Sequence, residues 1–458
     1  MSENGLTLAQ AKMRDAGVAQ QAIDVFSYYY RTLEEGATGL VPEESIEPLT
    51  DISSISDVEV SPEQARDALS RTVMIKLNGG LGTSMGLDRA KSLLPVRGGK
   101  TFLELIVDQV LAARRRYDVT LPLVFMNSFR TREDTFEALE SCPPIGVEGI
   151  PLDFLQNREP KLRADDLTPV TWEADPELEW CPPGHGDIYT ALTASGVLDA
   201  LLERGYRYAM TSNSDNLGAA PSARIAGWFA ASGAAYAPEM CRRTPADVKG
   251  GHLAVRRSDG RIILRDTAQT PADQMHYFTD QFRHPFFHTN NLWFDLEVLR
   301  DTLSQRQGIL GLPLIRNTKT VDPSDPASTP VIQMETAMGA AVEAFEKATA
   351  VEVSRSRFLP VKTTNDLFLL RSDVYEVDED GLLVQVPQEA CTVVLDPRYY
   401  KTIRDFEARF PEGVPSVRGA SSLTVEGDWT FGADVVATGD AVVREEGSPG
   451  IVPSGTRI

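Results

Sequence analysis

Apolar residues recur three or four positions apart through the first part of the chain. The segment at residues 8–36, LAQAKMRDAGVAQQAIDVFSYYYRTLEEG, keeps this spacing as far as Gly36, which is typical of amphipathic helix. Residues 41–65 lose the pattern and are acidic and rich in serine and proline, so they predict a linker that wraps onto another part of the molecule. We therefore expect an N-terminal helical segment and linker over residues 1–70.

From Arg71 the pattern changes to apolar strands that alternate with helices. The predicted strands are TVMIKL at residues 72–77, LPLVFMNS at residues 121–128 and YRYAMTSN at residues 206–213. The predicted helices are residues 101–118, opened by a capping box from Thr101 to Glu104, a helix from near Thr131, and residues 186–205. Such alternation predicts a mostly parallel sheet with helices on both faces, and in that architecture ligands bind at the carboxyl ends of the strands.

The C-terminal tail has a different period. Two sets of apolar residues recur six positions apart, namely Leu423, Trp429, Val435 and Ala441, and Val425, Phe431, Ala437 and Val443. A six-residue period with small and turn residues between the apolar positions predicts the short coils of a parallel β-helix. A few antiparallel strands are the alternative reading.

Length and charge narrow the classes of function. A chain of 458 residues is long enough for two or three domains. Its 66 acidic and 45 basic residues give a net charge of −21, which argues against binding to nucleic acid or to an anionic membrane through bulk electrostatics. A phosphate-bearing ligand must therefore find a local positive site.

The cysteines and the N-terminus favour a reducing compartment. The four cysteines are scattered, with no CxxC pair and no spacing typical of metal ligands, so we interpret them as reduced thiols. The first residues lack the basic and apolar blocks of a signal peptide, and no apolar run is long enough to span a bilayer. We expect a cytoplasmic protein.

The segment Val73–Val96, VMIKLNGGLGTSMGLDRAKSLLPV, carries the first candidate chemistry. It lacks the GxxxxGK(S/T) pattern of a P-loop, and the glycine that would complete a GxGxxG dinucleotide motif falls one position late, at Gly86. Glycines let backbone N–H groups approach phosphate oxygens, Thr83 and Ser84 add hydroxyl donors, and a following helix N-terminus would favour negative charge. The pattern indicates a phosphate-binding loop, with an ordinary tight turn as the alternative.

Further motifs accompany the glycine loop between residues 71 and 375. In order they read KLNGGLGTSMG followed by KS, MNSFRTREDT, PPGHGDIY, SNSDNLG, VKGG, TNNLW, VIQMETAMGAA and RFLPVKTTNDL. This series resembles one enzyme family, the eukaryotic-type UTP:glucose-1-phosphate uridylyltransferases. The resemblance implies an α/β fold with a mixed, mostly parallel, Rossmann-like nucleotidyltransferase sheet at residues 71–385. It also implies a left-handed parallel β-helix at residues 386–458, through which a homo-oligomer could form.

The activity implied is transfer of the uridylyl group of UTP to glucose 1-phosphate with Mg²⁺ as cofactor. Such a reaction needs positioning and neutralisation of charge, hence N–H-rich loops, lysines and a carboxylate for the metal. By resemblance Lys91 meets the triphosphate, and Lys362 neutralises charge between the sugar phosphate and the α-phosphate. Asp215 is then the catalytic carboxylate that binds Mg²⁺. The alternatives are a solvated Lys91, an ion pair of Lys362 with Asp366, and an Asx turn at Asp215.

Further residues are implied as substrate contacts. His185 donates to phosphate from a glycine-flanked loop, and Gln156 pairs with the uracil edge, since an amide both donates and accepts. Backbone groups of Gly79 and Gly80 complete the contacts with the base and the ribose. The remaining expected contacts are Leu77, Asn78, Gly82, Thr83, Gly184, Asn213, Gly250, Asp266, His288 and Asn290.

The chain departs from the family pattern at four places. Ala90 stands where the family has proline, His288 where it has asparagine, and Asp266 where it has glutamate, and the tail is short for the family. Two departures lie on the sugar side, and a changed set of hydrogen-bonding groups can change the substrate. Uridylyl transfer to galactose or N-acetylglucosamine 1-phosphate is therefore an alternative, as is a non-catalytic nucleotide-sugar binding protein. A dehydrogenase is disfavoured by the misplaced glycine.

Overall fold

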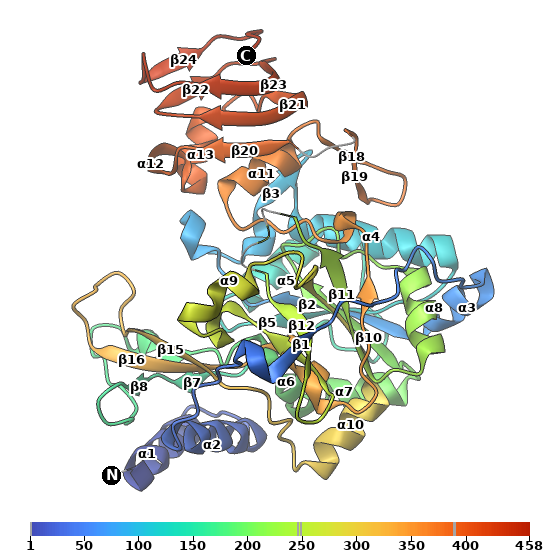
Figure 1. The fold of residues 1–458 in the computed structure, drawn as a ribbon, viewed down its shortest axis with the longest axis vertical. Helices are drawn as coiled ribbons and strands as arrows, with labels where there is room; N and C mark the ends of the chain where they lie inside the picture. The colour runs from blue at the N-terminus through green and yellow to red at the C-terminus, as the bar shows by residue number, and fades with distance from the viewer. Residues whose placement is uncertain (1, 245–246, 248–249, 388–390) are drawn as a thin grey trace.

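A mixed sheet of seven strands forms the centre of the computed structural model, which describes residues 2–244, 247, 250–387 and 391–458 (Figure 1). In spatial order its strands are β17 (Val351–Glu352), β11 (Tyr236–Arg242), β14 (Phe286–Asp295), β10 (Tyr208–Asn213), β2 (Thr72–Asn78), β5 (Leu123–Asn127) and β6 (Asp153–Leu155). Every neighbouring pair is parallel except those of β14, which runs antiparallel to β10 and β11. The α/β fold with a largely parallel central sheet agrees with the pattern of the sequence.

Helices cover the sheet, and the local signals that predicted them are visible in the contacts. The helices around the sheet are α4 (Phe102–Tyr117), α5 (Arg132–Glu140), α6 (Ile188–Ala194), α7 (Val197–Glu203), α8 (Ala223–Ser232) and α10 (Leu296–Gln305). The predicted capping box of α4 is present, since the Glu104 N–H donates to Thr101 Oγ1 (3.2 Å) and the Thr101 N–H donates to Glu104 Oε2 (2.8 Å). The single helix predicted over residues 186–205 is wrong, because the chain breaks at Gly196, where φ is +76°.

The N-terminal pattern yields two helices and a strand. Helices α1 (Ser2–Asp15) and α2 (Gln20–Glu34) account for the predicted helical segment. The stretch predicted as a linker contains β1 (Ile46–Pro48), which pairs antiparallel with β12 (His252–Arg256), and α3 (Pro62–Ser70) follows it. The linker therefore wraps onto β12 as a third strand of a small sheet that also contains β13.

Smaller elements surround the central sheet. They are β3 (Pro95–Arg97), β4 (Lys100–Thr101), β7 (Glu159–Pro160), β8 (Leu162–Arg163), β9 (Trp180–Cys181), β13 (Ile262–Arg265), α9 (Met275–Phe278), β15 (Ile315–Thr320), β16 (Pro330–Glu335), α11 (Thr364–Arg371), β18 (Tyr375–Val377) and β19 (Leu383–Gln385). Strands β15, β16 and β8 form a second small sheet, and α1 and α2 pack against it. Phe26 and Tyr30, both of α2, are buried there.

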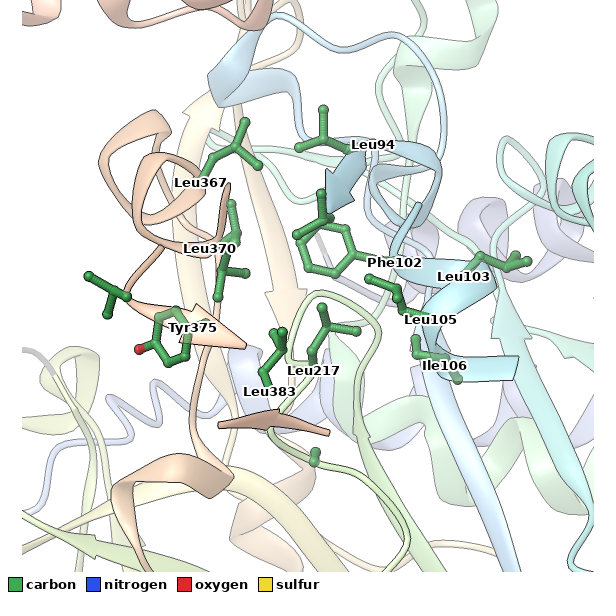
Figure 2. Close-up of a cluster of buried hydrophobic side chains, with 14 of the residues drawn as sticks. Leu94, Phe102, Leu103, Leu105, Ile106, Leu217, Leu367, Leu370, Tyr375 and Leu383 are labelled. Atoms are coloured by element: carbon green, nitrogen blue, oxygen red, sulfur yellow. The ribbon is translucent and has the colours of Figure 1, made fainter. Parts of the chain in front are cut away.

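The largest buried cluster joins α4 and α11 to the loop that follows β10. Figure 2 shows Leu367 and Leu370 of α11 across from Phe102 at the start of α4, with Leu217 and Leu383 below them. The loop is also held by polar contacts, because Gln109 Nε2 of α4 donates to the Leu217 carbonyl oxygen (3.1 Å). The core thus fixes the segment that contains Asp215.

Parallel ladders stack at the C-terminal end of the molecule (Figure 1). Their strands are β20 (Thr392–Leu395), β21 (Ser416–Val425), β22 (Trp429–Phe431), β23 (Val436–Val443) and β24 (Gly450–Val452), and two short helices, α12 (Pro397–Tyr400) and α13 (Ile403–Arg409), were not predicted. Leu423 pairs with Ala441 and Val425 with Val443, so residues three six-residue periods apart lie side by side. No helix in the described part of the chain is both long and apolar enough to span a membrane.

Candidate active site

A cavity of about 500 Å³ lies at the carboxyl ends of β2 and β10. Most of the residues expected to bind substrate line it, namely Leu77, Asn78, Gly79, Gly80, Gly82, Thr83, Lys91, Gln156, Gly184, His185, Asn213 and Asp215. The walls also include Leu81, Ser92, Met126, Pro182 and Ser214, which were not named as contacts although all five lie within the quoted motifs. The geometry therefore brings the β2 loop, the β10 loop and the PPGHGD loop together.

The glycine loop after β2 is closed by its own backbone. The Lys91 N–H donates to the Gly80 carbonyl oxygen (3.0 Å), and Gly82 has a φ of +64°, a conformation that favours glycine. A Cβ atom on Gly79 would lie 2.9 Å from Gln156 Oε1, so a side chain there would enter the space beside Gln156. The expected helix N-terminus after the loop is wrong, because only short 3₁₀ turns at Thr83–Met85 and Lys91–Leu93 follow it.

Lys91 and Asp215 form an ion pair within the cavity. Lys91 Nζ donates to Asp215 Oδ2 (2.5 Å) and to the carbonyl oxygen of Val361, and both charged side chains are largely buried. Val361 directly precedes Lys362. Lys91 therefore contacts the Asp215 side chain and also the residue next to Lys362. Lys91 is therefore not a solvated surface lysine in this structure.

Lys362 itself is exposed and does not line the cavity. Its ammonium lies 6.0 Å from the centre of the Phe358 ring. Asp366 accepts hydrogen bonds from the backbone N–H groups of Lys362 and Thr363 (both 2.8 Å) and so caps α11. No ion pair joins the side chains of Lys362 and Asp366 among the described residues, which leaves the ammonium available to a ligand.

His185 is a neutral hydrogen-bonding group. Its Nδ1 accepts the Met338 N–H (2.8 Å), and burial lowers the pKa of the imidazole to about 4. The proton at neutral pH therefore resides on Nε2. Gly184, whose φ is +78°, lies so close to Thr336 that a Cβ atom would meet the Thr336 carbonyl oxygen at 2.6 Å, so the loop requires glycine there.

Gln156 is tied to the same loop. Its Nε2 donates to the Gly184 carbonyl oxygen (2.9 Å), while the Asp187 carboxylate accepts both the backbone N–H (2.6 Å) and the side-chain Nδ2 (2.9 Å) of Asn157. These bonds fix the orientation of the Gln156 amide. Its Oε1 faces Gly79, the residue expected beside the nucleotide.

Four of the expected substrate contacts lie outside the lining of this cavity. Gly250, Asp266, His288 and Asn290 are absent from the cavity lining among the described residues. The Asp266 side chain caps the 3₁₀ turn Thr267–Gln269, and its burial raises the pKa of the carboxyl group. His288 Nδ1 lies 3.1 Å from Asn290 Oδ1. Val248 and Lys249 of the VKGG motif lie outside the described residues.

Histidine burial predicts a pH-dependent loss of stability. Burial lowers the pKa of His288 to about 4, so between pH 6.5 and 4 the unfolded chain takes up a proton that the folded chain does not. The free energy of unfolding must therefore fall as the pH decreases through this window. We expect the wild type to lose about 2 kcal/mol more than His288→Asn between pH 7 and pH 4.5, as measured by urea denaturation. Equal losses of unfolding free energy in the two proteins would show that the pKa of His288 is not lowered by burial.

The donor set is compatible with a single magnesium ion held jointly with substrate. Among the described residues no group of three or more His, Cys, Asp or Glu side chains is placed to hold a metal. Asp215 is the only acidic side chain among the described residues that line the cavity. Mg²⁺ is often bound by one or two carboxylates together with substrate phosphates and water, so one carboxylate fits this role.

Comparisons with known proteins agree with the geometry. A sequence model described as "UTP--glucose-1-phosphate uridylyltransferase" matches residues 23–437. The chain is 36% identical over 428 residues to "Probable UTP--glucose-1-phosphate uridylyltransferase" from Schizosaccharomyces pombe, covering 91% of this chain and 82% of that protein. It is 35% identical over 425 residues to the Solanum tuberosum enzyme of that name, covering 92% and 84%.

Solved structures superpose over almost the whole chain. A UDP-glucose phosphorylase from Trypanosoma brucei has a TM-score of 0.89 at 41% identity and covers 99% of this chain and 98% of that chain. A Leishmania major UDP-glucose pyrophosphorylase variant in complex with UDP-glucose has a TM-score of 0.91 at 40% identity, with the same coverage. The chain therefore belongs to the UTP–glucose-1-phosphate uridylyltransferase family.

Proposed function

We propose that this protein transfers the uridylyl group of UTP to glucose 1-phosphate and so forms UDP-glucose and pyrophosphate. The observation that carries the proposal is the convergence of the glycine loop, His185 and the Lys91–Asp215 pair on one cavity at the carboxyl ends of β2 and β10. Relatives named for this activity, and a related structure in complex with UDP-glucose, support it.

The reaction is an in-line displacement at phosphorus. An oxygen of the sugar phosphate forms a bond to the α-phosphorus of UTP, and the bond to the bridging oxygen of the β-phosphate breaks. Lys91 neutralises the pyrophosphate that leaves, and Lys362 neutralises charge between the sugar phosphate and the α-phosphate. Neutral His185 donates a hydrogen bond from Nε2 to phosphate.

Asp215 is the residue proposed to hold Mg²⁺. When bound, the ion supplies positive charge to the phosphate oxygens. The protein's own part is to place the carboxylate, and the Lys91 ammonium that already contacts it, on the same side of the cavity.

The uracil is proposed to lie between the glycine loop and Gln156. Replacing Gln156 with alanine should raise the KM for UTP about tenfold, since losing one polar pair in a buried contact costs about 1.4 kcal/mol, and should change kcat little. Initial rates at varied UTP measure this. Gln305→Ala, an exposed position on α10, is the matched control, and an unchanged KM for Gln156→Ala would exclude the base contact.

The identity of the sugar 1-phosphate has its own test. The direct test is pyrophosphate release from UTP and Mg²⁺ with a panel of sugar 1-phosphates, and with ATP, GTP and dTTP as competing nucleotides. Preference for UTP with glucose 1-phosphate supports the proposal. Faster turnover of galactose or N-acetylglucosamine 1-phosphate would favour the alternative substrate and assign His288 and Asp266 to specificity. Failure with every sugar would favour a non-catalytic nucleotide-sugar binding protein.

The remaining organisation is proposed in outline. We infer an N-terminal helical segment and linker at residues 1–70, a nucleotidyltransferase domain at residues 71–385 and a C-terminal left-handed β-helix at residues 386–458, supported by the parallel ladders of β20 to β24. A homo-oligomer through the C-terminal domain and a cytoplasmic location are also proposed. The four free cysteines are compatible with a reducing compartment.

A further inference from the structure

Two segments that carry proposed catalytic residues run side by side. We call residues 213–220 the Asp215 loop and residues 355–362 the Lys362 segment. The Val361 N–H donates to the Asp215 carbonyl oxygen (3.3 Å), and Asn216 forms an isolated antiparallel bridge with Pro360. The backbone of one segment therefore fixes the position of the other.

The side chain of Asn216 makes most of the hydrogen bonds that hold the two segments together. It is 2% exposed, and all of its hydrogen-bonding capacity is used. Its Oδ1 accepts the N–H groups of Leu359 (2.8 Å) and Gly218 (3.2 Å), while its Nδ2 donates to Arg357 O (3.1 Å) and to Asn291 Oδ1 (3.1 Å). A shorter or apolar side chain would leave several buried backbone groups without partners.

The two backbones approach so closely that only glycine fits between them. A Cβ atom on Gly218 would lie 2.3 Å from Ser356 O and 2.7 Å from the carbonyl carbon of Arg357. Both contacts are with backbone atoms, which cannot move aside without displacing the Lys362 segment. The two segments therefore approach more closely at Gly218 than a residue with a side chain would allow.

A buried ion pair anchors the assembly to the central sheet. Glu239 of β11 is fully buried and accepts hydrogen bonds from Arg357 Nε (2.9 Å) and Nη2 (2.7 Å), from Asn291 Nδ2 (3.0 Å) and from Trp293 Nε1 (2.9 Å). Arg357 Nη1 also donates to the carbonyl oxygen of Ala220, in the Asp215 loop (2.6 Å). The guanidinium group thus binds the sheet and the loop at the same time.

The loop is held from its other side by a buried lysine. Lys76 of β2 donates from Nζ to Ser212 Oγ (2.8 Å) and to the Ala219 carbonyl oxygen (2.9 Å). These bonds flank Asp215 in sequence. The loop is therefore fixed between β2 and the Lys362 segment.

We propose that Asn216 and Arg357, anchored by the buried carboxylate of Glu239, are positioning residues that set the separation between Lys362 and the Lys91–Asp215 pair. The inference rests on the proposed function and extends it to residues outside the cavity. The glycine loop follows β2 and Gln156 follows β6. Among the described residues no hydrogen bond joins either of them to Asn216, Arg357 or Glu239, so we expect binding of the base and ribose to depend little on the network. We expect the network to affect kcat because it holds the segment that carries Lys362.

A double-mutant cycle tests this coupling. Asn216→Ala should lower kcat by about 10- to 100-fold, because small displacements of catalytic groups have effects of this size, while the Kd for UTP changes less than about twofold. In a Lys362→Ala background the same substitution should lower kcat less than about threefold, since the group it positions is absent. A purely structural role would give the same fold-decrease in both backgrounds, and that result would overturn the inference.

A second variant keeps the test independent of folding. Arg357→Lys retains the positive charge beside Glu239 but loses the bond from Nη1 to the Ala220 carbonyl oxygen. The variant should therefore fold, and should lower kcat more than it lowers the affinity for UTP. Asn365→Ala is the matched control, because Asn365 Oδ1 accepts the N–H of Leu395, in β20, and among the described residues forms no hydrogen bond with the network. Wild-type protein that releases no pyrophosphate would refute the proposed function, whereas active wild type with an additive cycle would refute only the positioning role.

Discussion

Replacement of Lys362 with alanine should lower kcat by about 10²- to 10³-fold and change the KM for UTP far less. The ammonium is proposed to neutralise charge that grows between the sugar phosphate and the α-phosphate in the transition state, so its loss falls on the chemical step. Preorganised donors of this kind contribute about 3–4 kcal/mol to transition-state stabilisation. Steady-state kinetics with UTP and glucose 1-phosphate both varied measure the two constants separately.

One contact gives a reason to expect that Lys362 acts as more than a surface charge. Lys362 follows Val361, whose carbonyl oxygen accepts a hydrogen bond from Lys91, so the backbone of the Lys362 segment is tied to the Lys91–Asp215 pair. Lys347→Ala is a suitable control, because Lys347 is also exposed and lies in none of the motifs. A Lys362→Ala variant with normal kcat would remove this residue from the mechanism.

Local signals were sufficient to predict much of the fold. The capping box of Thr101 and Glu104 forms as expected, and the strands TVMIKL and YRYAMTSN pair in parallel at the centre of the sheet. The break at Gly196 was missed, because the apolar spacing on either side continues through it and only the left-handed backbone shows the interruption. Helices α12 and α13 were missed because each is short, with seven residues or fewer.

The cavity was predictable because its residues adjoin strand ends that already carry recognisable motifs. The positioning network was not, since its central contacts join residues far apart in the sequence: the Glu239–Arg357 and Asn216–Arg357 bonds span 118 and 141 residues. Their burial and pairing depend on the register of β10, β11 and β14. No local pattern around Glu239 indicates that an arginine will neutralise it.

The carboxylate of Asp215 is the remaining group on which the proposed chemistry depends. It is the only acidic side chain in the described lining of the cavity, and it accepts a hydrogen bond from Lys91. Asparagine has nearly the same shape but carries no charge, so Asp215→Asn removes both the proposed metal ligand and the ionic partner of the lysine. The buried Lys91 keeps its bond to the Val361 carbonyl oxygen, which should preserve the fold.

We therefore expect Asp215→Asn to lower kcat by about 10²- to 10³-fold and to raise the Mg²⁺ concentration for half-maximal activity about tenfold. Rates measured at fixed UTP and glucose 1-phosphate over a Mg²⁺ titration separate the two effects. Asp301→Asn, an exposed position on α10, controls for the loss of a negative charge. A slow variant whose Mg²⁺ dependence matches that of the wild type would show that Asp215 acts by orienting Lys91 and that the metal is held by substrate phosphates alone.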